Sequence, residues 1–488
     1  MASVRKRDTA FENIPSIKAK TLRINLNPDI YGTFAEIGAG QETARHFFRS
    51  GGASGTIAKA MSAYDKDFSD AIYGIEKDGR YVTQPRLHKM LAHEMQLMEE
   101  RISRDKHPER LFFSYANTVA TIDFSKRYKG HGWIGIRFQL DPTQKEYDEI
   151  IIHVRFKQNE ARLQQETLGI LGVNLIYGAF YKYDKPRKML KYLYDHIDKD
   201  TIEIDMINFS GPNFKEVDNR LMSLQLIKNN MTDAVMFGPD GNNLLPAAVL
   251  YKKNILALRG SFRPVTKVNM DMFEKSKELF FNEKKVNPEN SQIIFEITLS
   301  NLRAEGEINE RDFLDRAEIL CGLGSYVMVS NLNDHADLAT YLNRCRVQKI
   351  RMPIGIMNLI FIYGLDGEKD LSQQVLKSFG ELFSYDVKLY AYPYQREKDG
   401  EIITAKTLKT TPELENLHKH FLANNYIEDI ENFNEDHLQI FSYEIIEKIR
   451  GREDGWEENV PEYVAEMIKR KCLFDYPCSI EERQSSNK

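Results

Sequence analysis

The chain has 488 residues, more than one compact hydrophobic core accommodates, so its length predicts about two to four domains. Its composition is 42% hydrophobic and 28% charged, which is typical of globular proteins and excludes a disordered chain. The 67 basic and 72 acidic residues give a net charge of −5, and no basic stripe stands out. Nucleic-acid binding, which normally needs a basic excess, is therefore not expected.

The sequence predicts a cytoplasmic protein without membrane contact. Its basic N-terminus leads into no apolar segment of the kind that secretory signals have. The most apolar stretch, 352–365, is shorter than the roughly 18 residues that a spanning helix needs. The four cysteines are expected to be reduced thiols, because so few in a long chain are no disulfide framework. Zinc binding by Cys472 and Cys478 is an alternative, but they lack a second pair and a nearby histidine, so no structural metal is predicted.

The first part of the chain, residues 1–183, is predicted to be an α+β domain with glycine-rich loops. Residues 18–26 are strand-like, and a glycine-rich region follows at 31–55. Helical patterns are found at 55–63 and 84–103. Three alternating β-rich runs with turn signals then predict an antiparallel meander followed by a helix, at 111–122, 133–140, 149–156 and 159–181.

From residue 184 onward strand and helix patterns alternate, which predicts βαβ crossovers and a mostly parallel sheet. The strands are expected at 202–209, 234–237, 255–258, 293–299, 326–329 and 349–354. This α/β domain is assigned to 184–410, and the mainly helical region 411–488 is expected to pack on it. The predicted fold class is α/β, in which an N-terminal α+β unit precedes a Rossmann-like sheet and a helical C-terminal tail.

If these strands share one sheet, the loops after them should meet at its carboxyl edge, where α/β proteins bind ligands. Candidate ligand-binding residues in the first two loops are Ser210, Gly211, Gly238, Asp240 and Gly241. The loops also contain Arg259, Arg263 and Arg303, and a guanidinium suits phosphate or carboxylate. The alternative is that these are ordinary turn residues, in which case the arginines should not share one site.

A second candidate for phosphate binding is the glycine-rich segment of the N-terminal domain. Gly51, Gly52 and Ser54 precede the helical pattern at 55–63, and backbone amides in such loops can surround a phosphate. The segment lacks the ends of both a Walker A loop and a dinucleotide fingerprint. An ordinary flexible turn is the alternative.

Isolated histidines and aspartates are weaker candidates. His46, His131 and His153 could each act in acid–base chemistry, but a lone histidine is more often a surface or core residue. Asp205 lies within an apolar strand. Asp218 stands at a helix start, where it is expected to interact with the helix dipole.

Three segments near the C-terminus match the arrangement of a known family. They are Ile-Phe-Ser-Tyr-Glu-Ile-Ile at 440–446, Gly-Trp-Glu at 455–457 and Val-Pro-Glu-Tyr-Val-Ala-Glu-Met-Ile-Lys at 460–469. This tail resembles the end of the nicotinate- and nicotinamide-nucleotide adenylyltransferases, which have an Ile-Ser-x-Thr-x-x-Arg signature, a Trp-Glu-x-x-Val-Pro segment and a last helix. The whole chain is similar to a bacterial family of Bacteroidetes-type genomes that goes under the same name. The resemblance implies a Rossmann-like sheet, transfer of AMP from ATP to a nicotinic-type mononucleotide, and magnesium.

The sequence departs from this family at its phosphate-binding residues. Ser442 matches the serine of the tail signature, but Ile446 stands where the arginine belongs. The family's head motif, Gly-x-Phe-x-Pro-x-His-x-Gly-His, has its counterpart by position at 210–220, where both histidines are absent and Arg220 lies near the second. The resemblance therefore implies the frame of the site without its standard charge-stabilising residues.

These observations predict a nucleotide- or phosphometabolite-binding enzyme of nucleotidyltransferase-like type. Arg259, Arg263 and Arg220 would neutralise phosphate, and Asp240 would hold Mg²⁺ that arrives with the nucleotide. The alternative is a non-catalytic protein of the same fold that acts as a ligand sensor or as an assembly or scaffold subunit. The expected partner of the protein is a small molecule, either a nucleotide or a phosphorylated metabolite. A homo-oligomer is also expected as a possibility and fits the non-catalytic alternative.

Overall fold

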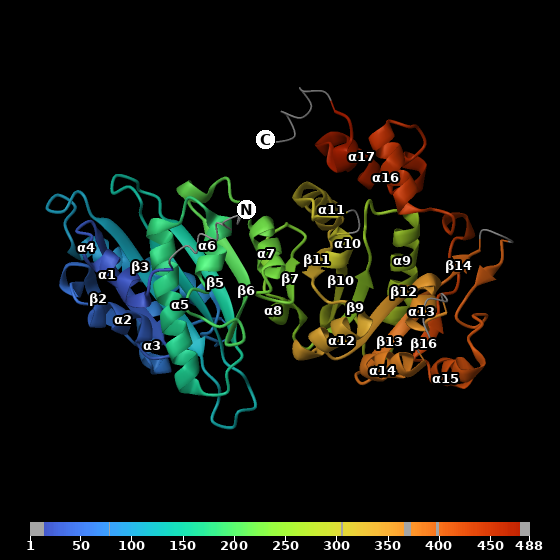
Figure 1. The fold of residues 1–488 in the computed structure, drawn as a ribbon, viewed down its shortest axis with the longest axis horizontal. Helices are drawn as coiled ribbons and strands as arrows, with labels where there is room; N and C mark the ends of the chain where they lie inside the picture. Colours follow the sequence, from blue (N-terminus) through green and yellow to red (C-terminus); the bar gives the residue numbers. More distant parts are fainter. Residues whose placement is uncertain (1–13, 78, 304–305, 366–371, 397–399, 479–488) are drawn as a thin grey trace, which may run out of the picture. The chain divides into compact units, whose positions relative to one another are not determined.

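The computed structural model describes residues 14–77, 79–303, 306–365, 372–396 and 400–478. They form two compact units, of which unit 1 ends at Thr232 and unit 2 begins at Asp233 (Figure 1). The boundary expected at residue 183 falls inside unit 1. The reason is the strand 202–210, which the sequence assigns to the second sheet but which pairs with the strands of unit 1.

Unit 1 contains seven α-helices and six strands among its described residues. They are α1 Ile17–Asn25, β1 Ile30–Ile37, α2 Glu42–Ser50, β2 Ile57–Met61, α3 Lys66–Tyr73, α4 Gln84–Arg101, β3 Leu111–Ala120, β4 His131–Phe138, β5 Asp148–Phe156, α5 Ala161–Tyr181, α6 Pro186–Tyr192, β6 Ile202–Ser210 and α7 Asn219–Lys228. The sheet order is β2-β1-β3-β4-β5-β6, in which β1 runs parallel to β2 and β3, and the remaining pairs are antiparallel. The predicted meander is therefore confirmed and is extended by β6.

Helices cover both faces of this sheet. Two neighbouring residues of β3 show this, since their side chains point to opposite faces and each contacts a different helix. Phe113 packs against Phe180 of α5, with ring centroids 5.8 Å apart. The next residue, Ser114, donates a hydrogen bond of 2.9 Å to the carbonyl of Leu91 in α4. The helices α1, α2 and α5 pack on one another on the first face.

Helix α1 corrects the expectation of a strand at 18–26. Its buried residues include Lys20, Thr21 and Ile24, whose spacing is that of one helix face. Two of them are polar, and the ammonium of Lys20 meets Asn174 at 2.8 Å and Asp195 at 2.5 Å. A buried helix face is normally recognised in a sequence by a stripe of apolar residues, so polar residues on this face conceal the helical pattern.

The main elements of unit 2 continue the chain with a βαβ arrangement. They are β7 Ala234–Phe237, β8 Asn243–Leu244, α8 Pro246–Leu250, β9 Asn254–Arg259, α9 Lys267–Asn282, β10 Ser291–Thr298, α10 Leu299–Leu302, α11 Glu310–Gly322, β11 Tyr326–Ser330, α12 His335–Arg344, β12 Ile350–Gly355, α13 Ile356–Ile362, α14 Ser372–Leu382, β13 Val387–Tyr392, β14 Tyr394–Gln395, β15 Ile402–Ile403, α15 Pro412–Ala423, β16 Ile427–Asp429, α16 Ser442–Gly451 and α17 Glu462–Lys471. The main sheet has the order β16-β13-β12-β9-β10-β11-β7-β8. Only β7 runs against the other strands, so the sheet is mostly parallel, as the predicted Rossmann-like sheet requires.

One large apolar core lies on the side of this sheet that α12, α14 and α15 cover. It includes Ile255 and Ala257 of β9, Met352 of β12 and Leu389 of β13.

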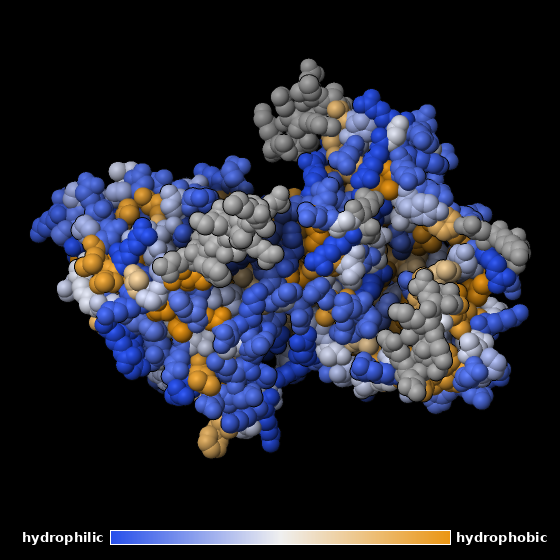
Figure 2. Space-filling view, viewed as in Figure 1, coloured by the Kyte–Doolittle hydropathy of each residue, from blue (hydrophilic) through white to orange (hydrophobic). Residues whose placement is uncertain are grey.

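On the face of the molecule seen in Figure 2, hydrophilic residues predominate and hydrophobic residues form small separate groups. Among the described residues, every helix is too short or too polar to cross a membrane.

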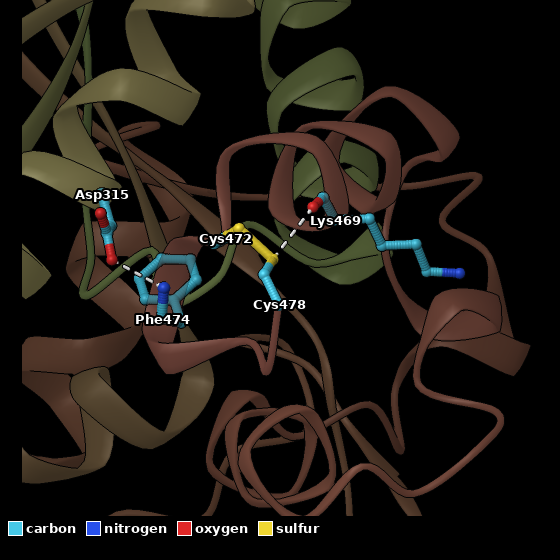
Figure 3. The surroundings of a disulfide bond; sticks show 5 residues. All are labelled: Asp315, Lys469, Cys472, Phe474 and Cys478. Atoms are coloured by element: carbon cyan, nitrogen blue, oxygen red, sulfur yellow. Dashed lines mark hydrogen bonds between the residues drawn. A yellow bond between two sulfur atoms is a disulfide. The ribbon is translucent and has the colours of Figure 1, made fainter. Parts of the chain in front are cut away.

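The prediction that the cysteines are reduced thiols is wrong for the two cysteines of the C-terminal tail. Cys472 and Cys478, expected as reduced thiols, form a disulfide directly after α17 (Figure 3). Inside the small loop that it closes, the backbone N–H of Phe474 donates to a carboxylate oxygen of Asp315 in α11 at 2.6 Å. Asp315 is buried, and desolvation raises its pKa to about 6.

Candidate functional site

The strand order of the second sheet reverses at β9. From β9 the chain adds β10 and β11 on one side, and it then returns to add β12, β13 and β16 on the other. β9 pairs with β10 along its whole length, whereas its pairing with β12 is confined to Ile255↔Ile350 and Leu256↔Arg351. Beyond this point the two strands no longer form a ladder with each other. Ligands of open α/β sheets bind at such a switch point, outside the carboxyl ends of the strands.

A buried hydrogen-bonded cluster spans the carboxyl ends of three neighbouring strands. Arg259 at the end of β9 makes a bidentate ion pair with Glu296 of β10, with distances of 2.7 and 2.9 Å. Ser330 at the end of β11 donates to the same carboxylate at 2.5 Å. His335, half-buried at the start of α12, has a pKa lowered to about 3 by desolvation and then by the Arg259 guanidinium. This histidine is neutral near pH 7 and can donate or accept a hydrogen bond.

A second cluster fixes the loop between β9 and α9. Arg263 of this loop forms an ion pair with Asp312 of α11. The other carboxylate oxygen of Asp312 meets Arg316, which is only 2% exposed, at 2.5 Å. Arg316 also donates to the backbone carbonyl of Ser261 at 3.1 Å. Two guanidinium groups thus converge on one carboxylate beside the loop.

The loop leads into the N-terminus of α9, a helix of 16 residues. Thr266 caps this helix, and its side chain forms a capping box with Asn269. The Asn269 side chain accepts from the Thr266 backbone N–H at 3.0 Å, and the Asn269 N–H donates to the Thr266 hydroxyl at 3.4 Å. An N-terminus that begins at a switch point favours an anion, because its first N–H groups point out of the helix.

This loop also fits the head motif of the adenylyltransferases better than the segment at 210–220 does. Gly260, Phe262 and Pro264 stand at the glycine, phenylalanine and proline of Gly-x-Phe-x-Pro-x-His-x-Gly-His. Thr266 and Asn269 then occupy the two histidine positions. Sequence reasoning missed this match because it took the strand at 202–209 as the first of the sheet. The proline after the phenylalanine, absent at 210–220, was the signal that distinguishes the two.

The three arginines expected at the edge have three separate environments. Arg259 is paired within the sheet and Arg263 is paired with α11. Arg303 is exposed at the C-cap of α10. A single cluster of arginines is therefore not formed, although Arg259 and Arg263 both lie at the carboxyl edge.

Strand direction excludes Asp240 from this edge. β7 runs antiparallel to β11, so its carboxyl end lies at the edge where β11 begins. Gly238, Asp240 and Gly241 lie in the turn from β7 to β8, at the opposite edge from Arg259. The carboxylate of Asp240 accepts hydrogen bonds from the backbone and side chain of Asn242 at 3.0 and 2.8 Å, as in an ordinary turn. The expectation that Asp240 shares an edge with Arg259 is therefore wrong.

The segment at 210–220 belongs to unit 1. Ser210 ends β6 and pairs with Glu149 of β5, because β6 joins the first sheet and not the second. Gly211 has a φ of 113° and lies against the backbone of Asp148, where a side chain would clash. Arg220 forms an ion pair of 2.8 Å with Asp218. Because β6 belongs to the first sheet, the expectation that this loop shares an edge with Arg259 is wrong.

The glycine-rich segment at 51–55 does not start a helix. A single 3-10 turn, Ala53–Gly55, leads into the edge strand β2, where a helical pattern was expected. The carbonyl of Gly51 accepts from the side chain of Asn25 at 2.7 Å, and Gly52 lies against the same residue. Gly51, Gly52 and Ser54 thus form a turn that packs on α1, without the helix N-terminus that a phosphate loop needs.

Ser442, the remaining predicted residue, is the first residue of α16 and is half-buried. Two surface hollows in the structure have volumes of about 420 and 490 Å³, and each is lined by a short stretch of chain at a single helix, α2 or α17. Neither hollow includes a residue of the carboxyl edge.

The chain matches no protein-family model and none of the curated proteins. Solved structures with partial similarity include a competence-damaged protein (CinA) superfamily protein from Enterobacter cloacae, with 12% identity, 37% of this chain and 98% of that chain covered, and a TM-score of 0.25. A competence/damage-inducible protein from Agrobacterium tumefaciens has 13% identity, the same coverage and a TM-score of 0.23. A CinA superfamily protein from Escherichia coli has 11% identity, 39% of this chain and 94% of that chain covered, and a TM-score of 0.23. Similarities with such low TM-scores carry no argument about function.

Proposed function

We propose that unit 2 binds a nucleotide or another phosphorylated metabolite at the switch point between β9 and β12. The observation that carries this proposal is the position of the loop at 260–266. It follows the strand at which the sheet reverses, it leads into the N-terminus of α9, and it contains the Gly-x-Phe-x-Pro frame.

The charges around the loop support an anionic ligand. Arg263 and Arg316 both pair with the carboxylate of Asp312, so two guanidinium groups lie at the loop. The Arg259–Glu296 pair is neutral overall, and His335 adds a neutral hydrogen-bonding group beside it. A phosphate would gain from this field and from the helix N-terminus, each of which is a modest effect of about 1 kcal/mol.

Adenylyl transfer has less support than binding. The two positions at which the adenylyltransferases carry histidines hold Thr266 and Asn269, and these side chains are bonded to each other at the helix start. Neither side chain can carry a positive charge, which the transferring phosphates require. The proposal is therefore a ligand-binding function, with a sensor role as its natural consequence.

The two tryptophans allow a direct test, because Trp133 belongs to unit 1 and Trp456 to unit 2. Thermal unfolding is followed by fluorescence of W133F and W456F variants, with ATP, a nicotinic mononucleotide, inorganic pyrophosphate or adenosine. A phosphorylated ligand at 100 times its Kd should stabilise unit 2 by about 2.7 kcal/mol, and adenosine should not. The proposal fails if no phosphorylated compound shifts the transition reported by Trp456. Release of pyrophosphate from ATP would show that the unit is an enzyme after all.

A further inference from the structure

Three residues that stand far apart in the sequence form a hydrogen-bonded chain in the sheet of unit 1. Nδ1 of His153 in β5 lies 2.5 Å from a carboxylate oxygen of Asp205 in β6. Nε2 of His153 lies 3.2 Å from Nδ1 of His131 in β4. His153 and Asp205 are 2% and 4% exposed, whereas His131 is half-buried. The chain thus runs from a buried carboxylate to a histidine that solvent reaches.

A β-bulge places Asp205 in this chain. His153 pairs with Met206, while the next residue of β5, Val154, pairs with Ile204, so that Asp205 is an extra residue in β6. Bulges redirect a side chain relative to the regular alternation of a strand, and they are frequent beside active sites. Trp133, close to His131 on β4, packs edge-on against His153 with ring centroids 4.8 Å apart and holds the ring in place.

The order of the hydrogen bonds determines where the protons lie. An ionised carboxylate can only accept, so Nδ1 of a neutral His153 must carry the proton and its Nε2 must accept. The proton between the two rings therefore belongs to Nδ1 of His131. This leaves the lone pair of Nε2 of His131, for which no hydrogen-bond partner is found among the described residues.

The surroundings of His131 are cationic. Arg155 is its direct neighbour on β5, and Lys129 and Lys157 lie two residues further along the same stretches of chain. The Lys129 ammonium lies 3.4 Å from the carbonyl of Lys157. A second carboxylate close to Asp205 is that of Glu203, which accepts a hydrogen bond of 2.7 Å from Thr232. Arg155 is also the register partner of Glu203; burial and then Asp205 raise the pKa of that carboxyl, and Arg155 and Lys157 oppose the rise. Counted with Glu203 and Asp205, the three cations exceed the carboxylates by one charge, and this excess favours an anionic reactant.

We propose that Asp205 and His153 position His131 so that its Nε2 is the nucleophile of a reactive centre in unit 1, with phosphoryl donors as its class of substrate. In this step the lone pair of Nε2 forms a bond to phosphorus, and the bond from phosphorus to the leaving group breaks with its electron pair staying on the leaving group. The imidazolium that results keeps its Nδ1–H. Its positive charge is stabilised through His153 by the carboxylate of Asp205, while the excess of positive charge in the neighbourhood stabilises the phosphoryl oxygens.

The test uses the full chain and phosphoramidate, whose leaving group is ammonia. Peptide mass spectrometry locates the phosphoryl group, and ³¹P NMR shows which ring nitrogen carries it. We expect phosphorylation of Nε2 of His131 on the order of 100-fold faster than that of His46. His46 is a matched control in the same unit, since it is also half-buried with a pKa lowered by desolvation, but its ring has no hydrogen-bond partner among the described residues.

Two variants separate the proposed role from a structural one. Asp205→Asn preserves the shape of the side chain but removes its charge, so phosphorylation of His131 should slow on the order of 100-fold and lose its preference for Nε2. His46→Gln should leave the rate at His131 unchanged. If Asp205→Asn does not fold, ¹⁵N NMR of the wild-type imidazoles decides, because the proposal requires the proton of neutral His131 on Nδ1. A proton on Nε2, or equal labelling of His131 and His46, overturns the proposal.

Discussion

Four buried carboxylates, two in each unit, are held in different ways. In unit 2, Glu296 and Asp312 each face a guanidinium, which keeps its proton at any pH that a protein survives. In unit 1, Glu36 is 1% exposed and accepts hydrogen bonds from the backbone N–H groups of Thr43 and Ala44 and from an amide, without a cation. Asp205 faces an imidazole. Glu296 and Asp312 thus face permanent charges, whereas the protonation of Glu36 can change near neutral pH.

The largest effect should come from breaking the shared pair in unit 2. Asp312→Ala removes the carboxylate that the buried Arg316 contacts at 2.5 Å, and the unit should lose roughly 3–5 kcal/mol of unfolding free energy. Urea unfolding followed by Trp456 fluorescence in a W133F background measures this loss. Lys419→Ala of the same unit is the control, because the exposed pair of Lys419 with Glu415 should contribute only about 0.3–0.5 kcal/mol. Equal effects of the two variants would show that burial does not decide the strength of these pairs.

A smaller effect is expected from Glu36, and it should depend on pH. Burial raises the pKa of Glu36 from 4.5 to about 7, and the hydrogen bonds from the N–H groups of Ala44 and Thr43 oppose the rise. The folded state thus binds the proton more tightly than the unfolded state, so this carboxyl should lower the stability of unit 1 as pH rises from about 4.5 to about 7. The change is on the order of 3 kcal/mol, since one unit of pKa corresponds to about 1.4 kcal/mol.

Glu36→Gln tests this assignment. The variant should remove the pH-dependent part of the stability of unit 1, measured by urea unfolding at pH 5 and pH 8 with Trp133 as the probe. Unit 2, followed through Trp456, should respond to the same pH change equally in the wild type and in the variant. A pH dependence of unit 1 that survives the substitution would assign it to another group.

The smallest effect concerns the cap of α9. Thr266→Ala removes both hydrogen bonds of the threonine hydroxyl in the capping box, and unit 2 should lose about 1 kcal/mol of unfolding free energy. If Thr266 only holds the helix start, its loss should leave the Kd for a nucleotide unchanged in a titration. A Kd that rises with the substitution would instead place the hydroxyl in contact with phosphate and would strengthen the case for transfer chemistry.

Alternation and turn signals suffice to predict most elements of the molecule, including the meander β3-β4-β5 and the parallel strands of unit 2. They do not reveal which sheet a strand joins or in which direction it runs. β6 and β7 each have the pattern of a buried strand, yet β6 joins the first sheet and β7 runs antiparallel, which removes Ser210 and Asp240 from the predicted edge. Pairing depends on residues far away in the chain, and no local pattern contains that information.

The candidate sites show the same limit. Arg259 and Arg263 were found from the sequence, but their partners Glu296 and Asp312 lie 37 and 49 residues away. His131, His153 and Asp205 each look isolated, and only the sheet register with its bulge brings them together. Helix α1 was mistaken for a strand because its inward face contains Lys20 and Asn25. Predictions that no finding tests are the cytoplasmic location, the homo-oligomer and the relation to the adenylyltransferases.

Gly355 offers the most direct test of ligand binding at the switch point. It ends β12, and extending the register of β12 with β9 places it level with Gly260. Apart from Gly355 itself and its two chain neighbours, no atom among the described residues lies within 4 Å of the position of a Cβ, and the φ of −68° is accessible to any residue, so Gly355→Asp adds a carboxylate without steric strain. Gly355→Asn is the neutral control of the same shape, and both residues are good helix caps.

The measurement is the Kd of unit 2 for ATP or pyrophosphate, determined by calorimetric titration of the full chain with each variant. The account predicts that Gly355→Asp weakens binding about tenfold, or about 1.4 kcal/mol, through repulsion of the phosphate, while Gly355→Asn binds like the wild type. Gly380→Asp, at an exposed and equally open position of α14, should have no effect. Equal affinities of the Gly355→Asp and Gly355→Asn variants, or weakening by Gly380→Asp alone, would contradict a phosphate site between β9 and β12.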